Sequence, residues 1–197
     1  MTVLPTISLQ DGDVLIVVDV QNDFLPGGAL GVPHGEAVIP VLNAAIKHFH
    51  DRGLLIVVTR DWHPANHCSF RGQGGPWPPH CIAHTLGAAL AADLRLPPDV
   101  TVISKAAMPD EEAYSGFNGT RLEGILRVHR AQRLFIGGLA TEYCVLHTVK
   151  DAVARRFETY VLKDAIRAVN MLPDDGAKAE REMVSEGAHL ITLEMIA

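Results

Sequence analysis

The stretch Val14-Leu15-Ile16-Val17-Val18, followed by Asp19, decides the fold. It is a short run of branched apolar residues without the polar alternation of a half-exposed strand, so it is typical of a parallel strand buried on both faces. Similar runs recur along the chain at 54–58, 100–103, 134–136, 159–162 and 189–193. Six buried parallel strands are therefore predicted.

Helical periodicity fills the intervals between these runs. It predicts helices over 36–52, 121–129, 142–155 and 174–186. Strands that alternate with helices indicate the α/β class, here a three-layer α/β/α architecture around a mostly parallel six-stranded sheet. We expect the Rossmann-like, doubly wound strand order 3-2-1-4-5-6. The length of 197 residues favours a single domain over 1–197.

Composition excludes several classes of partner. The chain has 17 Lys and Arg against 23 Asp and Glu, and this net charge of −6 argues against a nucleic-acid partner. Its longest purely apolar runs are about five residues, whereas a membrane span needs ~20. Residues 1–13 lack the basic start and apolar core of a signal peptide.

The cysteine count suggests the compartment. Three cysteines cannot form a complete disulfide set, so we expect free thiols in the cytoplasm. Apolar helix faces serve a core or an interface equally well, so a homo-oligomer stays an open alternative.

Residues of chemical interest follow the ends of the first four predicted strands. These residues are Asp19, Asp61, Lys105 and Cys144. Because open α/β sheets bind ligands at the carboxyl ends of their strands, around the switch point, we expect these side chains to converge. Each of them taken alone also has an ordinary explanation, such as a turn-capping Asp or a surface Lys.

Cys144 lies in the first turn of a predicted helix, behind the potential N-cap Thr141. The positive end of a helix lowers a thiol pKa, and its free N–H groups can hold an oxyanion. A buried, unreactive cysteine is an equally weighted alternative from this feature alone. A redox role is weaker, because the chain has no C-x-x-C pair.

The connection over 60–84 is rich in Gly and Pro but also carries four His and two Trp, so we expect an ordered loop beside a site. Asp61, His63, His67 and His80 are ligand types for zinc, iron or manganese. Solvated loop histidines are the alternative, but four such residues in a short stretch favour a metal.

Several motifs together resemble the nicotinamidases of the isochorismatase-like cysteine hydrolase superfamily. The motifs are DVQNDF at 19–24, DWHPANHCSF at 61–70, WPPHC at 77–81, YSGF at 114–117 and GLATEYCV at 138–145. The first and last indicate only the superfamily, whereas the D-x-H and WPPHC segments point to nicotinamidases within it. Tyr143 and Cys68 are small departures, and Cys68 and Cys81 have no assigned role.

The resemblance implies a role for each matching residue. Cys144 would be the nucleophile, Asp19 the general base and Lys105 the third member of the triad. The peptide between Leu139 and Ala140 would be cis, and the N–H groups of Ala140 and Cys144 would form the oxyanion hole.

The resemblance also implies a metal and a substrate slot. Asp61, His63 and His80, with His67 as a further ligand, would bind one divalent metal ion, with zinc expected first and iron or manganese as alternatives. Three aromatic side chains would wall a slot for a flat pyridine ring, namely Phe24, Trp77 and Tyr114.

The expected function is hydrolysis of nicotinamide to nicotinate and ammonia through a thioester, with pyrazinamide also accepted. Salvage of NAD breakdown products for pyridine nucleotide biosynthesis follows from the same resemblance. Three alternatives remain: another small-carboxamide amidase of the superfamily, a metal-free isochorismatase, and a catalytically idle metal- or ligand-binding module.

Overall fold

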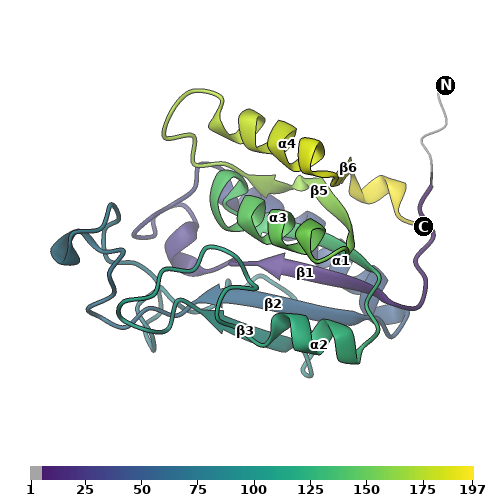
Figure 1. Cartoon of the computed structure of the whole chain (residues 1–197), viewed down its shortest axis with the longest axis horizontal. Helices are drawn as coiled ribbons and strands as arrows, with labels where there is room; N and C mark the ends of the chain where they lie inside the picture. The colour runs from purple at the N-terminus through teal and green to yellow at the C-terminus, as the bar shows by residue number, and fades with distance from the viewer. Residues whose placement is uncertain (1–5) are drawn as a thin grey trace.

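Six parallel strands form one sheet in the order β3-β2-β1-β4-β5-β6, which confirms the predicted doubly wound topology (Figure 1). The computed structural model describes residues 6–197. The first five residues of the segment 1–13, which we predict not to be a signal peptide, lie outside the described part. The strands are β1 (Asp13–Val18), β2 (Leu55–Asp61), β3 (Thr101–Lys105), β4 (Arg133–Leu139), β5 (Glu158–Arg167) and β6 (His189–Ile191). The sheet is entirely parallel, where the sequence indicated a mostly parallel one.

Helices cover both faces of the sheet and complete three layers (Figure 1). The α-helices are α1 (Val38–Asp51), α2 (Leu122–Val128), α3 (Leu146–Ala154) and α4 (Asp175–Glu186). Short helical turns are η1 (Asn22–Phe24), η2 (Gly35–Ala37), η3 (Arg71–Gln73), η4 (Thr141–Val145) and η5 (Leu193–Met195). All four helical regions thus lie where the periodicity predicts them. None of the helices within 6–197 is long and apolar enough to cross a membrane.

Strand β1 shows why these residues form a central strand. Leu15 and Val17 point into the core that contains α1, whereas Ile16 and Val18 point into the core formed with α2, α3 and α4. All four side chains are fully buried. Because successive strand residues face opposite sides, only an unbroken apolar run fills both cores.

Gly138 lets β4 approach the end of β1 closely. Its φ is +134°, and a Cβ atom there would lie 2.0 Å from the carbonyl oxygen of Val18. Any side chain would therefore push apart the two strands that flank the switch point, immediately before the chain reaches Ala140.

The connection between β2 and β3 spans residues 62–100 and contains the loop that the sequence predicts beside a site. Two isolated parallel bridges hold it, one between His63 and Ile82 and one between Phe70 and Trp77. The part that contains these bridges lies beyond the carboxyl end of the sheet, at the left of Figure 1.

At the opposite end of the sheet, a charged pair joins the first residues of β1 and β4. Asp13 is 1% exposed, and Arg133 donates two hydrogen bonds of 2.6 Å to its two carboxylate oxygens. These hydrogen bonds to Asp13 raise the pKa of the Arg133 guanidinium, so Arg133 keeps its positive charge. Removal of one partner leaves a buried charge without compensation.

We expect Arg133→Met to lower the free energy of unfolding by about 3 kcal/mol, because Asp13 keeps its burial and loses its cation. Urea denaturation followed by circular dichroism measures this loss. Lys47→Met is the matched control, since Lys47 pairs with Asp51 on the exposed surface of α1, and it should leave the midpoint unchanged within error. Equal effects of the two substitutions would contradict the prediction.

Candidate active site

The ammonium group of Lys105 lies at the centre of the site. It is 2.9 Å from Asp19 Oδ2, 2.5 Å from Asp61 Oδ1 and 3.4 Å from Cys144 Sγ, and it donates to the carbonyl oxygen of Ala113 at 3.0 Å. Lys105 is only 1% exposed. The structure therefore brings together the four residues that follow the first four strands, as the topology predicts.

The charge state of this cluster follows from burial and contact. Burial by itself would lower the pKa of Lys105, but Asp19 and Asp61 outweigh it and raise that pKa well above its usual value. Burial also raises the pKa of Asp61, yet Lys105 and His63 bring it below its usual range. Lys105 and Asp61 are thus both charged and form an ion pair.

Asp19 behaves differently from Asp61. Burial raises its pKa more than Lys105 lowers it, and the nearby charge of Asp61 raises it further. Thr59 Oγ1 donates to Asp19 Oδ1 at 2.6 Å, whereas Oδ2 makes no hydrogen bond with the described residues and only the ion pair with Lys105. Two carboxylates with pKa values displaced in opposite directions are typical of an acid–base pair, and Asp19 is the one suited to accept and return a proton.

Cys144 is a buried thiol and not the thiolate that its position predicts. Burial raises its pKa well above the usual value, and the attraction of Lys105 offsets this only in part. The expectation that a helix N-terminus lowers its pKa is therefore wrong for the resting protein, because desolvation dominates at 5% exposure. Such a thiol needs a neighbouring base, and Asp19 lies within 4.8 Å of Sγ.

The turn that carries Cys144 also differs from the predicted α-helix. Residues Thr141–Val145 form a π-helical turn before α3, and the carbonyl oxygen of Ala140 accepts from the N–H groups of both Tyr143 and Val145. Ala140, and not Thr141, is the residue that precedes the first turn. The peptide between Leu139 and Ala140 is cis, as the family resemblance implies.

A second group of side chains could hold a metal ion. Ligand atoms of Asp61, His63 and His80 lie within 4.8 Å of one another, and all three residues are buried. Nδ1 of His63 faces the carbonyl oxygen of Ala106 at 3.2 Å, and Nδ1 of His80 faces that of Pro78 at 2.8 Å. A carbonyl oxygen accepts only from N–H, so Nε2 of each ring retains its lone pair for a ligand.

His67 is predicted as a further ligand, but the structure does not bring it into this group. Its Nδ1 lies 2.7 Å from Ser69 Oγ and its Nε2 lies 3.1 Å from the carbonyl oxygen of Glu111. Both ring nitrogens are therefore used within the protein. Its ring packs against that of His63, with centroids 4.2 Å apart, so it supports a ligand without offering a lone pair of its own.

Ligand atoms of Asp19, Asp61 and Cys144 also lie within 4.8 Å of one another. The Lys105 ammonium already contacts all three of these side chains. A divalent ion among them would face a buried positive charge, so this second group is not a metal site.

Gln21 is a supporting residue that lies within the DVQNDF motif but to which the sequence assigned no role. Its side-chain oxygen accepts from the N–H of Asp61 at 2.7 Å, and its amide nitrogen donates to the carbonyl oxygens of Asp61 at 2.8 Å and Ala88 at 2.9 Å. Gln21 is fully buried. It thus fixes the backbone of the residue that contacts Lys105 on one side and the histidines on the other.

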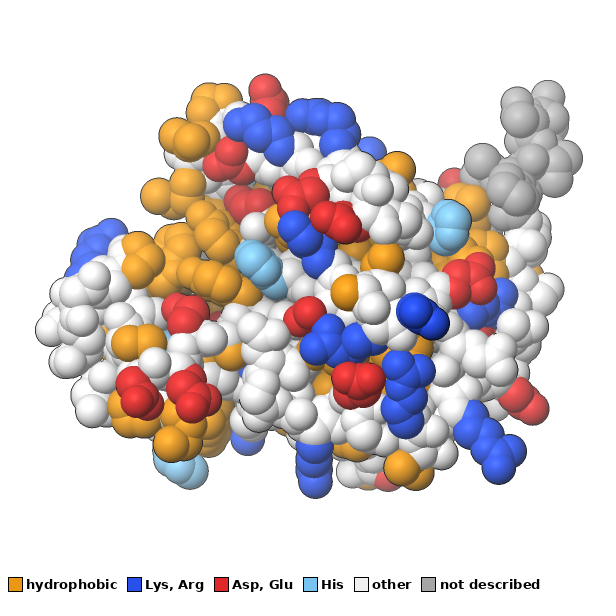
Figure 2. Space-filling view, in the orientation of Figure 1, with side chains coloured by type: hydrophobic (Ala, Val, Ile, Leu, Met, Phe, Trp, Pro, Cys, Tyr) orange, Lys and Arg blue, Asp and Glu red, His pale blue; other side chains and the backbone are white. Residues whose placement is uncertain are grey.

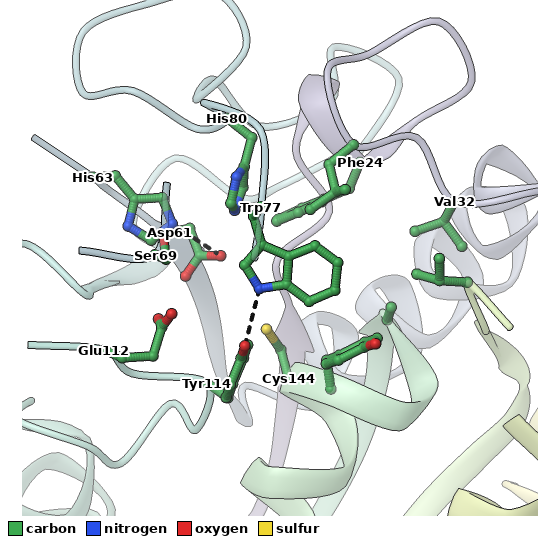
Figure 3. Close-up of a pocket in the computed structure, with 14 residues that line it drawn as sticks. Phe24, Val32, Asp61, His63, Ser69, Trp77, His80, Glu112, Tyr114 and Cys144 are labelled. Atoms are coloured by element: carbon green, nitrogen blue, oxygen red, sulfur yellow. Dashed lines mark hydrogen bonds and ion pairs between the residues drawn. The ribbon is translucent and has the colours of Figure 1, made fainter. Parts of the chain in front are cut away.

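A cavity of about 460 Å³, its open mouth included, lies over Cys144 (Figure 3). The three predicted wall residues line it, and Trp77 Nε1 donates to the hydroxyl oxygen of Tyr114 at 3.0 Å. Fourteen residues line the cavity: Phe24, Leu30, Val32, Asp61, His63, Ser69, Trp77, His80, Glu112, Tyr114, Ala140, Tyr143, Cys144 and Val169. Such a largely aromatic slot suits a flat ring.

Several wall residues lie outside the predicted set. The ring of Tyr143 packs edge-on against that of Trp77, with ring centroids 5.1 Å apart. In the sequence, only its position next to Cys144 indicated that it lies at the site. Val169 and Glu112 come from loops without a recognisable motif. Hydrophobic side chains gather at this end of the molecule, on the left of Figure 2.

Comparisons with known proteins agree with this geometry. The isochorismatase domain model matches residues 13–195. The nicotinamidase of Escherichia coli (strain K12) is 40% identical over 200 residues, which cover 91% of this chain and 94% of that protein. A pyrazinamidase of Pyrococcus horikoshii in complex with zinc is 51% identical, with a TM-score of 0.88 over 92% of this chain and 99% of that one. The PnC1 protein of L. infantum in complex with nicotinate is 36% identical, with a TM-score of 0.90 over 98% of both chains.

We expect Lys105→Met to destabilise the metal-free protein by about 3 kcal/mol or more at pH 8, because two buried carboxylates lose their cation. Without Lys105, the pKa values of Asp19 and Asp61 would be higher in the folded state than in the unfolded state. The free energy of unfolding of the variant would therefore fall as the pH rises. The deficit should therefore be smaller at pH 5 than at pH 8.

Chemical denaturation at the two pH values, with a chelator present, measures the Lys105 effect. Lys163→Met is the control, since Lys163 pairs with Glu180 on the surface. A deficit for Lys105→Met that does not grow with pH would contradict the assignment of the ion cluster.

Proposed function

This chain belongs to the isochorismatase family, and we propose that it hydrolyses the carboxamide of nicotinamide to nicotinate and ammonia. The observation that carries the proposal is the buried Lys105 ammonium, which gathers Cys144 and Asp19 beneath an aromatic cavity. The activities named for the E. coli and P. horikoshii relatives and the nicotinate bound by the L. infantum protein support it. We propose pyrazinamide as a second substrate on the same grounds.

In the proposed first step, Asp19 takes the proton of the Cys144 thiol while Sγ attacks the carboxamide carbon. The raised pKa of Asp19 supports this role, because a base must hold the proton until the leaving group needs it. Lys105 remains charged throughout and stabilises the thiolate as it forms. The N–H groups of Ala140 and Cys144 would hold the oxyanion of the tetrahedral intermediate.

The tetrahedral intermediate then collapses. Asp19 returns its proton to the amide nitrogen, the C–N bond breaks and ammonia leaves, so that a thioester remains on Cys144. In the second half, Asp19 accepts a proton from water, the hydroxyl oxygen attacks the thioester carbon, and the C–S bond breaks. Asp19 returns its proton to the sulfur of Cys144, the carboxylic acid product releases a proton to the solvent, and nicotinate departs.

Asp61, His63 and His80 would hold one divalent metal ion beside the cavity, and the zinc complex of the P. horikoshii relative supports zinc before iron or manganese. Burial lowers the pKa of His80, which keeps it in the neutral form that binds metals. A bound metal would supply a Lewis acid that holds the pyridine nitrogen and orients the ring. Phe24, Trp77 and Tyr114 would hold the ring faces.

The physiological role that we propose is salvage of nicotinamide in the cytoplasm for pyridine nucleotide biosynthesis. The substrate that we propose, nicotinamide, is small and uncharged. The acidic composition of the chain agrees with such a substrate, since it offers no surplus of cations for a polyanion.

We expect Cys144→Ala to lower ammonia release from nicotinamide by at least roughly 10³-fold, because the nucleophile is gone. An enzyme-coupled ammonia assay on metal-loaded protein measures this. Cys68→Ala is the matched control, because Cys68 does not line the cavity, and it should retain turnover. Retained turnover in Cys144→Ala would exclude Cys144 as the nucleophile.

The same ammonia assay decides among the alternatives. Efficient turnover of other small carboxamides but not of nicotinamide would indicate a different amidase of the family. Metal-loaded wild type without any amidase activity would indicate an idle binding module.

The geometry of the histidines predicts unequal effects on metal content. After dialysis against zinc and removal of the excess, His80→Ala should hold far less than one equivalent, because a direct ligand is lost. His67→Ala should keep close to one equivalent, since both nitrogens of His67 already bond within the protein. Elemental analysis measures the content. Equal losses in both variants would restore His67 as a direct ligand.

A further inference from the structure

Glu112 is a charged residue of the cavity that the proposed mechanism does not use. The 14 lining residues include two carboxylates, Asp61 and Glu112, and, within the described part of the chain, neither Lys nor Arg. Asp61 is committed to Lys105 and to the neighbouring histidines. Glu112 makes no ion pair with any described residue, so its negative charge faces the cavity without compensation.

One hydrogen bond orients the carboxylate of Glu112 at the edge of the cavity. Its Oε1 accepts from the N–H of Ala113 at 3.0 Å, and the carbonyl oxygen of Ala113 in turn accepts from Lys105. Figure 3 shows the carboxylate beside Tyr114, at the edge of the cavity that also contains Cys144. The residue is exposed, so it lies where the cavity opens to solvent.

The local electrostatics agree with this position. Burial raises the pKa of the Tyr114 hydroxyl, and the charge of Glu112 adds to the rise. A negative potential therefore extends over a wall residue of the cavity.

This potential matters because the substrate and the product differ mainly in charge. Nicotinamide is neutral, whereas nicotinate carries a carboxylate at neutral pH. The two molecules have nearly the same shape, so apolar contacts with the cavity walls cannot separate them. A fixed negative charge at the mouth disfavours the anion and leaves the neutral amide unaffected.

We propose that Glu112 is a specificity-determining residue that disfavours carboxylates at the mouth of the cavity. It would weaken rebinding of the nicotinate product and exclude aromatic carboxamides that carry a further carboxylate. The inference rests on the proposed function and narrows the substrate class to carboxamides without a negative charge. Because Glu112 is exposed, its effect is screened by salt.

The test compares the binding of the two molecules in protein that cannot react. Zinc-loaded Cys144→Ala is titrated with nicotinamide and with nicotinate by calorimetry, with and without the additional Glu112→Gln substitution. Gln keeps an oxygen that accepts from Ala113 and removes only the charge. The ratio of the Kd for nicotinate to the Kd for nicotinamide should fall by roughly three- to tenfold.

Glu111→Gln is the matched control. It removes the same charge one residue earlier in the chain, on a side chain that does not line the cavity, and it should change the ratio less than about twofold. The effect of Glu112→Gln should also shrink when the salt concentration rises from roughly 0.02 M to 0.5 M.

The outcomes separate the two proposals. If both molecules bind and Glu112→Gln leaves the ratio unchanged, or shifts it no more than Glu111→Gln, the role of Glu112 is overturned and the proposed function stands. If neither molecule binds to the zinc-loaded protein, the proposed function fails and the inference fails with it.

Discussion

The buried ammonium group of Lys105 is the interaction on which the site depends. Two buried carboxylates and a buried thiol lie against it, and each of these groups is costly to bury as an anion. One cation shared among them stabilises the arrangement. The pKa values of the two carboxyl groups nevertheless shift in opposite directions. Asp61 remains ionised, whereas the more deeply affected Asp19 can hold a proton.

This cluster exists because parallel strands end at one edge of the sheet. Asp19 and Cys144 follow β1 and β4, which are neighbours in the sheet, while Asp61 ends β2 and Lys105 ends β3. Two of the proposed metal ligands, His63 and His80, come from the long connection between β2 and β3, whereas the third is Asp61 itself. Gln21 and Asp23, just beyond β1, hold that connection against the sheet through the backbone of Asp61 and the N–H of Cys81. The sheet thus positions Cys144, and the loop that Gln21 and Asp23 hold in place positions the histidines.

Sequence reasoning succeeded where a residue's place along the chain determines its place in space. Buried strands, alternating helices and the convergence of Asp19, Asp61, Lys105 and Cys144 all follow from the pattern of β1 and its repeats. It failed where local geometry competes with pattern. Thr141 is in the position of a cap but begins a π-helical turn. The ligand role of His67 stays a prediction, although both of its ring nitrogens contact other groups, Ser69 and Glu111.

The sequence by itself determined the fold class, the strand order and the residue types of the site, because hydrophobic periodicity and strand-end motifs act over short stretches of chain. Only the tertiary structure decided the burial of Cys144, the contacts of the His67 ring, and the places of Gln21 and Glu112. These properties depend on desolvation and on contacts between residues tens of positions apart. The position of Cys144 at the start of a helix predicts a lowered thiol pKa. Its burial, together with the nearby charge of Asp19, raises that pKa instead.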